Sequence, residues 1–222
     1  MPRLPEMDSP SLLTYRPALP DDADVIAPLI YRIDPLSFDH LFNDLLQGLS
    51  PIDVIAICFR APGGMFSWRS TEVALQDGWL AGFLIAYDAH SPQSSFMHLG
   101  RAIGHYGVRV LMRLAWRGLA LSRIAKQCLP HSWYVAFVGV NPDVQSRGIG
   151  SSLLLRSMEA ARSAGCTQVE LDVDMNNPRA QALYERLGFS VRSETSGSDV
   201  PRLPGFAGSR RMIYVPKAGR QP

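Results

Sequence analysis

The chain has 222 residues, of which 46% are hydrophobic, and a formal net charge of +2 at pH 7. This is enough apolar material for one sizeable core, and the charge balance lacks the basic excess of a nucleic-acid-binding protein. Cys58, Cys128 and Cys166 form no CxxC pair, which argues against a disulfide framework or a zinc site and favours a reducing, cytoplasmic setting.

The chain is expected to form a single domain with a short extension at each end. Residues 1–11 are polar and proline-rich and lack the apolar core of a signal peptide, so we expect a flexible leader. No run of about 18 apolar residues is available to span a membrane. The domain is expected to cover 12–217, with a tail at 218–222.

In the N-terminal half, the apolar pattern predicts two helices between a first strand and a hairpin. Asp21 or Asp22 caps the first helix, which Pro28 weakens or bends. The second helix is closed by Gly48 and Pro51. Its apolar stripe has helical spacing and consists of Phe38, Leu41, Phe42, Leu45 and Leu46. An Asp-Gly turn signal joins the last two of the expected strands, which lie at 12–17, 71–76 and 79–87.

In the C-terminal half, strands and helices alternate. A buried strand ends at Pro142, and the following helix has Gly165 at its C-terminal capping place. The next helix has proline at its first position and glycine just past its end. We expect helices within 149–165 and 177–189, and strands within 132–142, 167–175, 189–194 and 210–216. This order predicts an α/β (α+β) fold in which a mixed sheet carries helices on its faces.

A cluster of glycines lies between the strand that ends at Pro142 and the next helix. The pattern Gln145-x-x-Gly148-x-Gly150 is no Walker A loop, and Leu153 takes the third glycine place of a dinucleotide fingerprint. Unpaired N–H groups and the positive end of a helix dipole at this place suit a pyrophosphate. Arg147 adds a positive charge within reach. An ordinary strand-to-helix turn is the alternative interpretation.

Two blocks of sequence resemble the GNAT family of N-acetyltransferases. They read VGVNPDVQSRGIGSSLL and LDVDMNNPRAQALYERLGFSV, and the resemblance covers about 133–192. It implies a mixed, mostly antiparallel sheet flanked by helices, with a helical insertion at 89–131 before the central strand. The second block is also slightly similar to part of puromycin acetyltransferase, over too short a stretch to suggest a substrate.

The resemblance implies a set of residues that bind acetyl-coenzyme A. The main-chain N–H groups of the glycine turn would hold the pyrophosphate, and this turn consists of Gln145, Ser146, Arg147, Gly148, Ile149, Gly150 and Ser151. Val138 and Val140 would offer backbone hydrogen bonds to the pantetheine arm, and Asn177 would contact that arm. Ser146 stands where glycine is common in the family, but its main-chain N–H survives the change.

Acetyl transfer to an amine needs groups that handle protons. Tyr184 matches the family tyrosine beside the thioester sulfur and would protonate the departing thiolate; its alternative is a core aromatic residue. Some members place a glutamate as base where this chain has Tyr134, and His131 at the start of that strand is a residue type that can serve as a base. Three acids that alternate with apolar residues are expected to be solvated, namely Glu170, Asp172 and Asp174. A water chain or an already neutral amine would need no dedicated base.

Two functions follow from these residues. The first is an acetyl-CoA-dependent N-acetyltransferase that transfers the acetyl group directly to an amine of a small molecule or peptide. The second is a non-catalytic acyl-CoA-binding or regulatory module on the same fold. The missing strand glutamate favours the second slightly, whereas Tyr184 and Asn177 favour the first more. We expect no metal and no nucleic-acid partner, and a homodimer is left open.

The insertion contains a long basic helix, expected at 104–126. Its apolar stripe consists of Leu111, Leu114, Gly118, Leu121 and Ala125, and its basic residues include Arg109, Arg113 and Arg117. One interpretation is a solvated basic face on an ordinary helix. The other is that the helix covers the acceptor side of the site and attracts an acidic acceptor, an anionic surface or a partner subunit.

Overall fold

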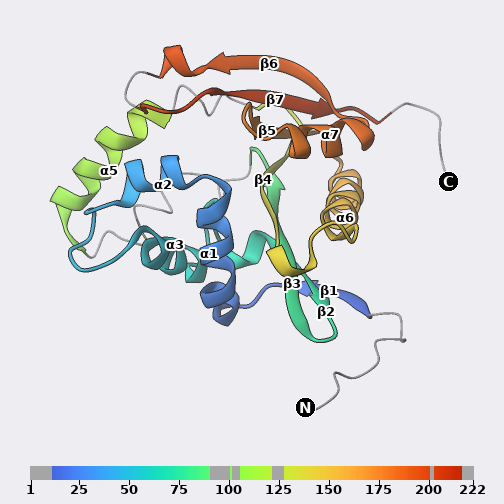
Figure 1. The fold of residues 1–222 in the computed structure, drawn as a ribbon, viewed down its shortest axis with the longest axis horizontal. Coiled ribbons are helices and arrows are strands. Elements are labelled where there is room, and N and C mark those ends of the chain that lie inside the picture. The colour runs from blue at the N-terminus through green and yellow to red at the C-terminus, as the bar shows by residue number, and fades with distance from the viewer. Residues whose placement is uncertain (1–11, 91–100, 102–105, 122–127, 201–202, 217–222) are drawn as a thin grey trace, which may run out of the picture.

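The computed structural model describes residues 12–90, 101, 106–121, 128–200 and 203–216. In this part of the chain, the strands are β1 Leu13–Pro17, β2 Thr71–Gln76, β3 Trp79–Asp88, β4 Ser132–Val140, β5 Gln168–Asp174, β6 Ser190–Ser196 and β7 Gly208–Tyr214. They form one seven-stranded sheet in the order β1-β2-β3-β4-β5-β7-β6 (Figure 1). Neighbours pair antiparallel except β4 and β5, which are parallel. This confirms the predicted mixed, mostly antiparallel sheet.

Helices cover both faces of the sheet. Their bounds are α1 Ala23–Ile33, α2 Pro35–Phe42, α3 Pro51–Arg60, α5 Val108–Leu121, α6 Ile149–Ser163 and α7 Pro178–Arg186. Short 3₁₀ turns occupy Pro20–Asp22, Trp68–Ser70, Pro142–Val144 and Gly197–Asp199. In Figure 1, α1, α2, α3 and α5 lie on one side of β4, whereas α6 and α7 lie on the other.

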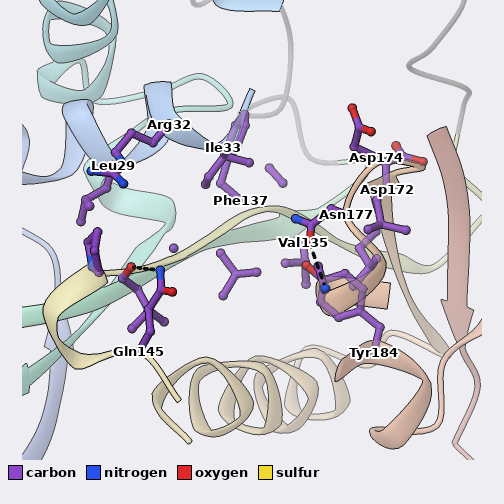
Figure 2. Close-up of a pocket in the computed structure, with 18 residues that line it drawn as sticks. Leu29, Arg32, Ile33, Val135, Phe137, Gln145, Asp172, Asp174, Asn177 and Tyr184 are labelled. Atoms are coloured by element: carbon purple, nitrogen blue, oxygen red, sulfur yellow. Dashed lines mark hydrogen bonds between the residues drawn. The ribbon is translucent and has the colours of Figure 1, made fainter. Parts of the chain in front are cut away.

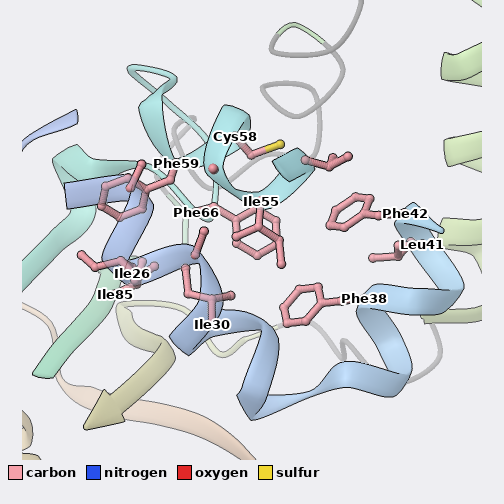
Figure 3. Close-up of a cluster of buried hydrophobic side chains, with 14 of the residues drawn as sticks. Ile26, Ile30, Phe38, Leu41, Phe42, Ile55, Cys58, Phe59, Phe66 and Ile85 are labelled. Atoms are coloured by element: carbon pink, nitrogen blue, oxygen red, sulfur yellow. The ribbon is translucent and has the colours of Figure 1, made fainter. Parts of the chain in front are cut away.

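Each face of the sheet buries its own hydrophobic cluster. The cluster under α1–α3 is rich in aromatic rings, and Figure 3 shows Phe38, Phe42 and Phe66 meeting Ile30 and Ile55. The cluster under α6 and α7 is largely aliphatic and includes Leu153, Leu171 and Met212. The central strands are therefore covered on both sides, whereas the edge strand β6 is largely exposed.

The N-terminal half differs from the prediction at Pro51. This proline does not close a helix but opens α3, which the sequence analysis missed. Ser50 caps α3 by accepting a hydrogen bond from the N–H of Asp53, and the Asp53 carboxylate accepts one from the N–H of Ser50. Proline is tolerated at a first helical position because its missing N–H is not needed there. The preceding helix α2 ends at Phe42, although Leu45 and Leu46 beyond it are buried as predicted.

Helix α5 of the predicted insertion packs on α2. Residues 102–105 and 122–127 lie outside the described part, so the predicted bounds of 104–126 are not tested. Leu114 is buried, and Leu111 and Leu121 pack against the same core. The Arg117 guanidinium donates hydrogen bonds to the carbonyls of Leu41 at 3.1 Å and Asn43 at 2.7 Å. Arg117 therefore caps the C-terminal end of α2 and does not belong to a fully solvated basic face.

The ends of the chain remain predictions. Residues 1–11 and 217–222 lie outside the described part, so the leader, the tail and the domain bounds at 12 and 217 are not tested. No helix among the described residues is long and apolar enough to cross a membrane.

Candidate functional site

Strands β4 and β5 separate part-way along their length. Their parallel pairing runs from Ser132↔Gln168 to Val135↔Leu171, yet β4 continues to Val140 and β5 to Asp174. Beyond the last pair, the edge of β4 that faces β5 has no sheet partner, which leaves backbone groups for a ligand. Of these, the Val140 carbonyl accepts a hydrogen bond from Gln145 Nε2 at 3.3 Å.

A cavity of about 330 Å³ fills this separation, which we call the split cavity (Figure 2). Its walls come from β4, β5, α1, α7 and the turn before α6. They are lined by Leu29, Arg32, Ile33, Val135–Val140, Pro142, Gln145, Leu171–Asp174, Asn177, Ala180 and Tyr184. In Figure 2, Gln145 and Tyr184 lie on the α6 side of β4, whereas Arg32 and Ile33 lie on the α1 side.

A second cavity of about 670 Å³ continues from the split cavity toward the glycine turn. We call it the turn cavity. The two cavities share Val138, Val140, Gln145, Asn177, Ala180 and Tyr184. The turn cavity is further lined by Ser146, Gly148, Ile149, Gly150, Ser151, Arg179, Leu183 and Arg186. Together the cavities form one groove that runs from the N-terminus of α6 to the separated strands.

The glycine turn presents unused backbone donors to the groove. Gly148 is the N-cap of α6 and has φ 82°. It has no side chain that could accept a hydrogen bond from the N–H groups of the first turn. The first backbone bond of the helix runs from the N–H of Ser152 to the Gly148 carbonyl at 3.0 Å. The N–H groups of Ile149, Gly150 and Ser151 therefore have no helical acceptor and lie at the positive end of a helix with 15 residues.

The missing side chain of Gly150 keeps the turn cavity open. A Cβ atom at this position would lie 3.6 Å from Val140 Cγ2 and 3.8 Å from Leu183 Cδ2. Both residues line the turn cavity, so a larger side chain at Gly150 would project into it. At Gly148 the space around a Cβ is open, and the positive φ explains the glycine instead.

Ser146 adopts a backbone conformation that glycine tolerates best. Its φ of 67° lies in the left-handed region, which carries a steric cost for a residue with a side chain. Its hydroxyl accepts a hydrogen bond from Arg179 Nη2 at 2.8 Å, which ties the turn to α7. The side chain that replaces glycine at this position thus makes a contact that glycine could not make.

Helix α7 contributes an amide and a phenol to the groove. Asn177 is the N-cap of α7, and its Oδ1 accepts a hydrogen bond from the N–H of Ala180 at 3.0 Å. Tyr184 is 7% exposed, and its ring packs on Phe189 with centroids 6.0 Å apart. Burial raises the pKa of Tyr184 to about 12, so the phenol stays protonated at neutral pH and can act as a donor.

Two arginines of α7 were missed by the sequence analysis. Arg179 and Arg186 line the turn cavity, whereas the predicted Arg147 is exposed and is absent from the lining. The signal was present in the helical spacing, since Arg179, Leu183 and Arg186 follow the i, i+4, i+7 pattern of one helix face. The groove is therefore basic on its α7 side.

The expectation that the acids of β5 are solvated is wrong for Glu170. Glu170 is 0% exposed, and its Oε2 lies 3.0 Å from Arg211 Nη1. The same guanidinium pairs with Asp172, since Arg211 Nε lies 2.7 Å from Asp172 Oδ1. Burial acts to raise the pKa of Glu170, but hydrogen bonds from Ser132, the Leu129 N–H and Arg211 outweigh it and leave this pKa below its ordinary value. Arg211 lies on β7, so the cluster locks β5 to its neighbour.

The two candidate residues at the start of β4 differ in their surroundings. The Tyr134 hydroxyl donates a hydrogen bond to Asp172 Oδ2 at 2.9 Å. Burial, followed by the charge of Asp172, raises the pKa of Tyr134 well above its ordinary value, so Tyr134 is no base at neutral pH. His131 is exposed, with φ 54°, and lines neither the split cavity nor the turn cavity.

The model of the acetyltransferase (GNAT) family matches residues 53–189, which is more than half of the chain. The chain belongs to the GNAT family. The match begins within α3 and ends just after α7, so it includes the separated strands, the glycine turn and α7, but not the α1 part of the wall.

Known proteins similar to this GNAT member share its fold over nearly the whole chain. A structure titled as the crystal structure of an acetyltransferase has a TM-score of 0.69 at 24% identity and covers 91% of this chain and 98% of its own. A structure of yncA from Salmonella typhimurium, titled as a putative acetyltransferase with its cofactor acetyl-CoA, has a TM-score of 0.55 at 16% identity. It covers 95% of this chain and 97% of its own.

Curated relatives match this GNAT member over part of their length. The mycothiol acetyltransferase of Saccharopolyspora erythraea is 28% identical over 64% of this chain and 41% of its own. The N-alpha-acetyltransferase MAK3 of Arabidopsis thaliana is 41% identical over 37% of this chain and 46% of its own. The chain thus spans less than half the length of these two relatives, so their activities support proposals only.

Proposed function

We propose that this protein is an acetyl-CoA-dependent N-acetyltransferase that transfers the acetyl group directly to an amine of a small molecule or peptide. The observation that carries the proposal is the groove from the uncapped N-terminus of α6 to the separated strands, with Tyr184 on its wall. The family membership of the chain supports the same activity.

The residues of the groove fit acetyl-coenzyme A along its length. We expect the turn from Gln145 to Ser151 to hold the pyrophosphate mainly through the N–H groups of Ile149, Gly150 and Ser151, because these donors have no helical acceptor at a helix N-terminus. Arg179 and Arg186 add positive charge beside that place. Val138 and Val140 on the edge of β4 and the amide of Asn177 line the groove, which supports their proposed hydrogen bonds to the pantetheine arm.

The reaction is a displacement at the thioester carbonyl. The amine nitrogen forms a bond to the carbonyl carbon, the carbon–sulfur bond breaks, and an ammonium acceptor yields an amide, the free thiol and one released proton. Complete proton transfer from Tyr184, with a pKa of about 12, to a thiolate with a pKa of about 8.5 is unfavourable. Tyr184 therefore acts by donating a hydrogen bond to the sulfur as negative charge develops on it.

An assay of coenzyme A release distinguishes the transferase from the alternative, a non-catalytic acyl-CoA-binding module. Protein, acetyl-CoA and a panel of amines are mixed, and free coenzyme A is followed with a thiol reagent. Turnover with any amine, above the rate without protein, supports the transferase. Tight binding of acetyl-CoA by calorimetry without turnover would instead favour the module.

A larger side chain at Gly150 tests whether acetyl-CoA binds in the turn cavity, because it would fill part of that cavity. We expect Gly150→Leu to weaken acetyl-CoA binding by at least about tenfold, since the loss of one good packing contact or donor already costs that much. Leucine is also a better helix former than glycine, so the variant should fold. Gly150→Ala is the control, because its Cβ meets neighbours at ordinary contact distances of 3.6 Å and 3.8 Å. Equal acetyl-CoA affinity in both folded variants, measured by calorimetry, would remove the turn from the binding site.

Asn177 has a capping role and a proposed binding role that two variants separate. Asn177→Asp keeps an oxygen for the Ala180 N–H but removes the amide donor, so we expect unchanged stability and a several-fold higher acetyl-CoA KM. Asn177→Ala loses the cap as well and should lower the free energy of unfolding by about 1 kcal/mol. A parental KM in the Asp variant would contradict the binding role.

We further propose that the protein works in the cytoplasm as a monomer or homodimer, with acetyl-CoA and the amine as its partners. All three cysteines are free, which is compatible with a reducing compartment. Sedimentation of the full chain would decide between monomer and dimer. We assign no catalytic role to His131, and Tyr134 enters the proposal as a residue that positions Asp172.

A further inference from the structure

A third cavity, of about 210 Å³, opens from the split cavity on the α1 and α2 side of the sheet. We call it the α2 cavity. Most of its wall is apolar and is formed by Phe38, Leu41, Met65, Phe66, Leu121 and Phe137. These residues come from α2, the segment before β2, the end of α5, and β4. The α5 helix of the insertion thus contributes to this wall through Leu121.

Three rings give the α2 cavity a rigid aromatic wall. The ring centroids of Phe66 and Phe137 are 5.5 Å apart, and Phe38 lies 5.9 Å from each of them. An engineered apolar cavity of about 150 Å³ accepts benzene, so the volume here suits one ring or branched aliphatic group with a short linker. A strongly polar ligand would lose its hydration without gaining hydrogen bonds from this wall.

The polar part of the same wall is acidic. Asp34, Asp172 and Asp174 line the α2 cavity, and its described lining contains no lysine or arginine. Asp172 is paired with Arg211. Asp34 and Asp174 accept hydrogen bonds from the N–H groups of Ser37 and Asn176 but have no cationic partner among the described residues. This arrangement attracts an ammonium group and repels an anion.

The acidic part lies where the α2 cavity meets the split cavity. The two share Ile33, Ala136, Phe137 and Asp172–Asp174, and the split cavity is also lined by Tyr184. Figure 2 shows Asp172 and Asp174 across β4 from Gln145. Arg32 lines the split cavity but not the α2 cavity. A ligand with its apolar group under the rings would therefore place a nearby amine at the separated strands.

We propose that the acceptor of this transferase is a primary amine joined by a short linker to one bulky apolar group, and that it carries no anionic group. The apolar group occupies the α2 cavity, and Asp174 binds the ammonium form and orients the nitrogen toward the thioester. This assignment rests on the proposed function for the transfer step. It differs from the alternative of an acidic acceptor drawn to the basic helix, of which Arg117 is engaged with the end of α2.

The first experiment compares probe amines by the rate of coenzyme A release. We expect kcat/KM for 2-phenylethylamine to exceed that for ethanolamine by at least about tenfold, on the scale of burying an apolar side chain, and to exceed that for glutamate by more. Phenylalanyl-glycinamide is a further arm, because it presents the same chemistry as an N-terminal residue and shows whether the source is a peptide or a free amine. A rate with ethanolamine or glutamate equal to or above both aromatic probes would overturn the assignment while leaving the transferase standing.

Two variants connect the preference to the α2 cavity. Asp174→Asn keeps the acceptor for the Asn176 N–H but removes the charge, so we expect the KM for 2-phenylethylamine to rise about tenfold with unchanged acetyl-CoA affinity. Leu121→Ala should raise the same KM several-fold without changing the poor KM for ethanolamine. Asp21→Asn on the exposed surface is the matched control. Parental KM values in both folded cavity variants would overturn the assignment.

A binding measurement keeps the assignment testable without turnover. 2-Phenylethylamine is titrated by calorimetry into the full chain saturated with coenzyme A, with ethanolamine as the comparison. Selective binding that Asp174→Asn weakens, in a protein that releases no coenzyme A with any amine, would support the amine site and contradict the transferase. Absence of selective binding would overturn the amine site whatever the outcome of the release assay.

Discussion

Tyr184→Phe is expected to lower kcat by about 10²-fold, the scale of a lost proton donor or charge-stabilising hydrogen bond in the transition state. The ring is buried against Phe189, and phenylalanine preserves that packing, so stability should change little. In the proposed role, the hydroxyl stabilises charge that develops only as the carbon–sulfur bond breaks. The KM for acetyl-CoA should therefore remain near the parental value.

A control substitution at another tyrosine shows whether the fall in kcat is specific to the Tyr184 hydroxyl. Tyr31→Phe removes a phenol that donates to Asp39 on the surface at 2.9 Å, and its kcat should stay parental. Because burial raises the pKa of Tyr184 to about 12, the rate in the parent should not decline between pH 7 and pH 9 through loss of this proton. A parental kcat in the Tyr184→Phe variant would reduce Tyr184 to a core aromatic residue.

Arg211→Met is expected to lower the free energy of unfolding by about 3–5 kcal/mol at pH 7, the cost of leaving a buried charge without its partner. Arg211 is 4% exposed and pairs with both Glu170 and Asp172. Methionine retains an unbranched side chain but leaves the two carboxylates without a cation. Urea unfolding of the parent and the variant measures the difference.

The pH dependence of this stability loss should show whether the two unpaired carboxylates cause it. In the parent, the lowered pKa of Glu170 contributes stability above its unfolded pKa of about 4.3, and this contribution is lost as pH falls through the folded pKa. In Arg211→Met, the unpaired carboxylate takes up a proton more readily, so the deficit should shrink as pH is lowered from 7 toward 5. Combining Arg211→Met with Glu170→Gln and Asp172→Asn should restore much of the stability. A constant deficit at all pH values would contradict a charge origin.

Local sequence patterns predicted the parts of the fold that depend on neighbouring residues. The Asp-Gly hairpin, the glycine turn and the Asn177–Pro178 start of α7 are each encoded within a few positions, and the structure has them where expected. The missed helix α3 is also local, because Ser50 and Asp53 form a capping box. The error there came from interpreting Pro51 as a helix end, although proline is equally compatible with a helix start.

Contacts between distant segments could not be predicted in the same way. Alternation along β5 suggests that Glu170 faces water, and only the position of Arg211 on the neighbouring strand shows that it is buried and paired. The α2 cavity likewise needs α2, the end of α5 and β4 to meet. The basic helix alone therefore left an acidic acceptor as one of several interpretations, whereas the assembled wall supports our proposal of an apolar amine.

A crystal structure of the protein with coenzyme A tests the central claim most directly. We predict that the pyrophosphate lies about 2.7–3.1 Å from the N–H groups of the 148–151 turn and that the sulfur lies within hydrogen-bond reach of the Tyr184 hydroxyl. The pantetheine arm should run along the unpaired edge of β4. Coenzyme A bound outside the groove, or with its sulfur away from the separated strands, would contradict the account.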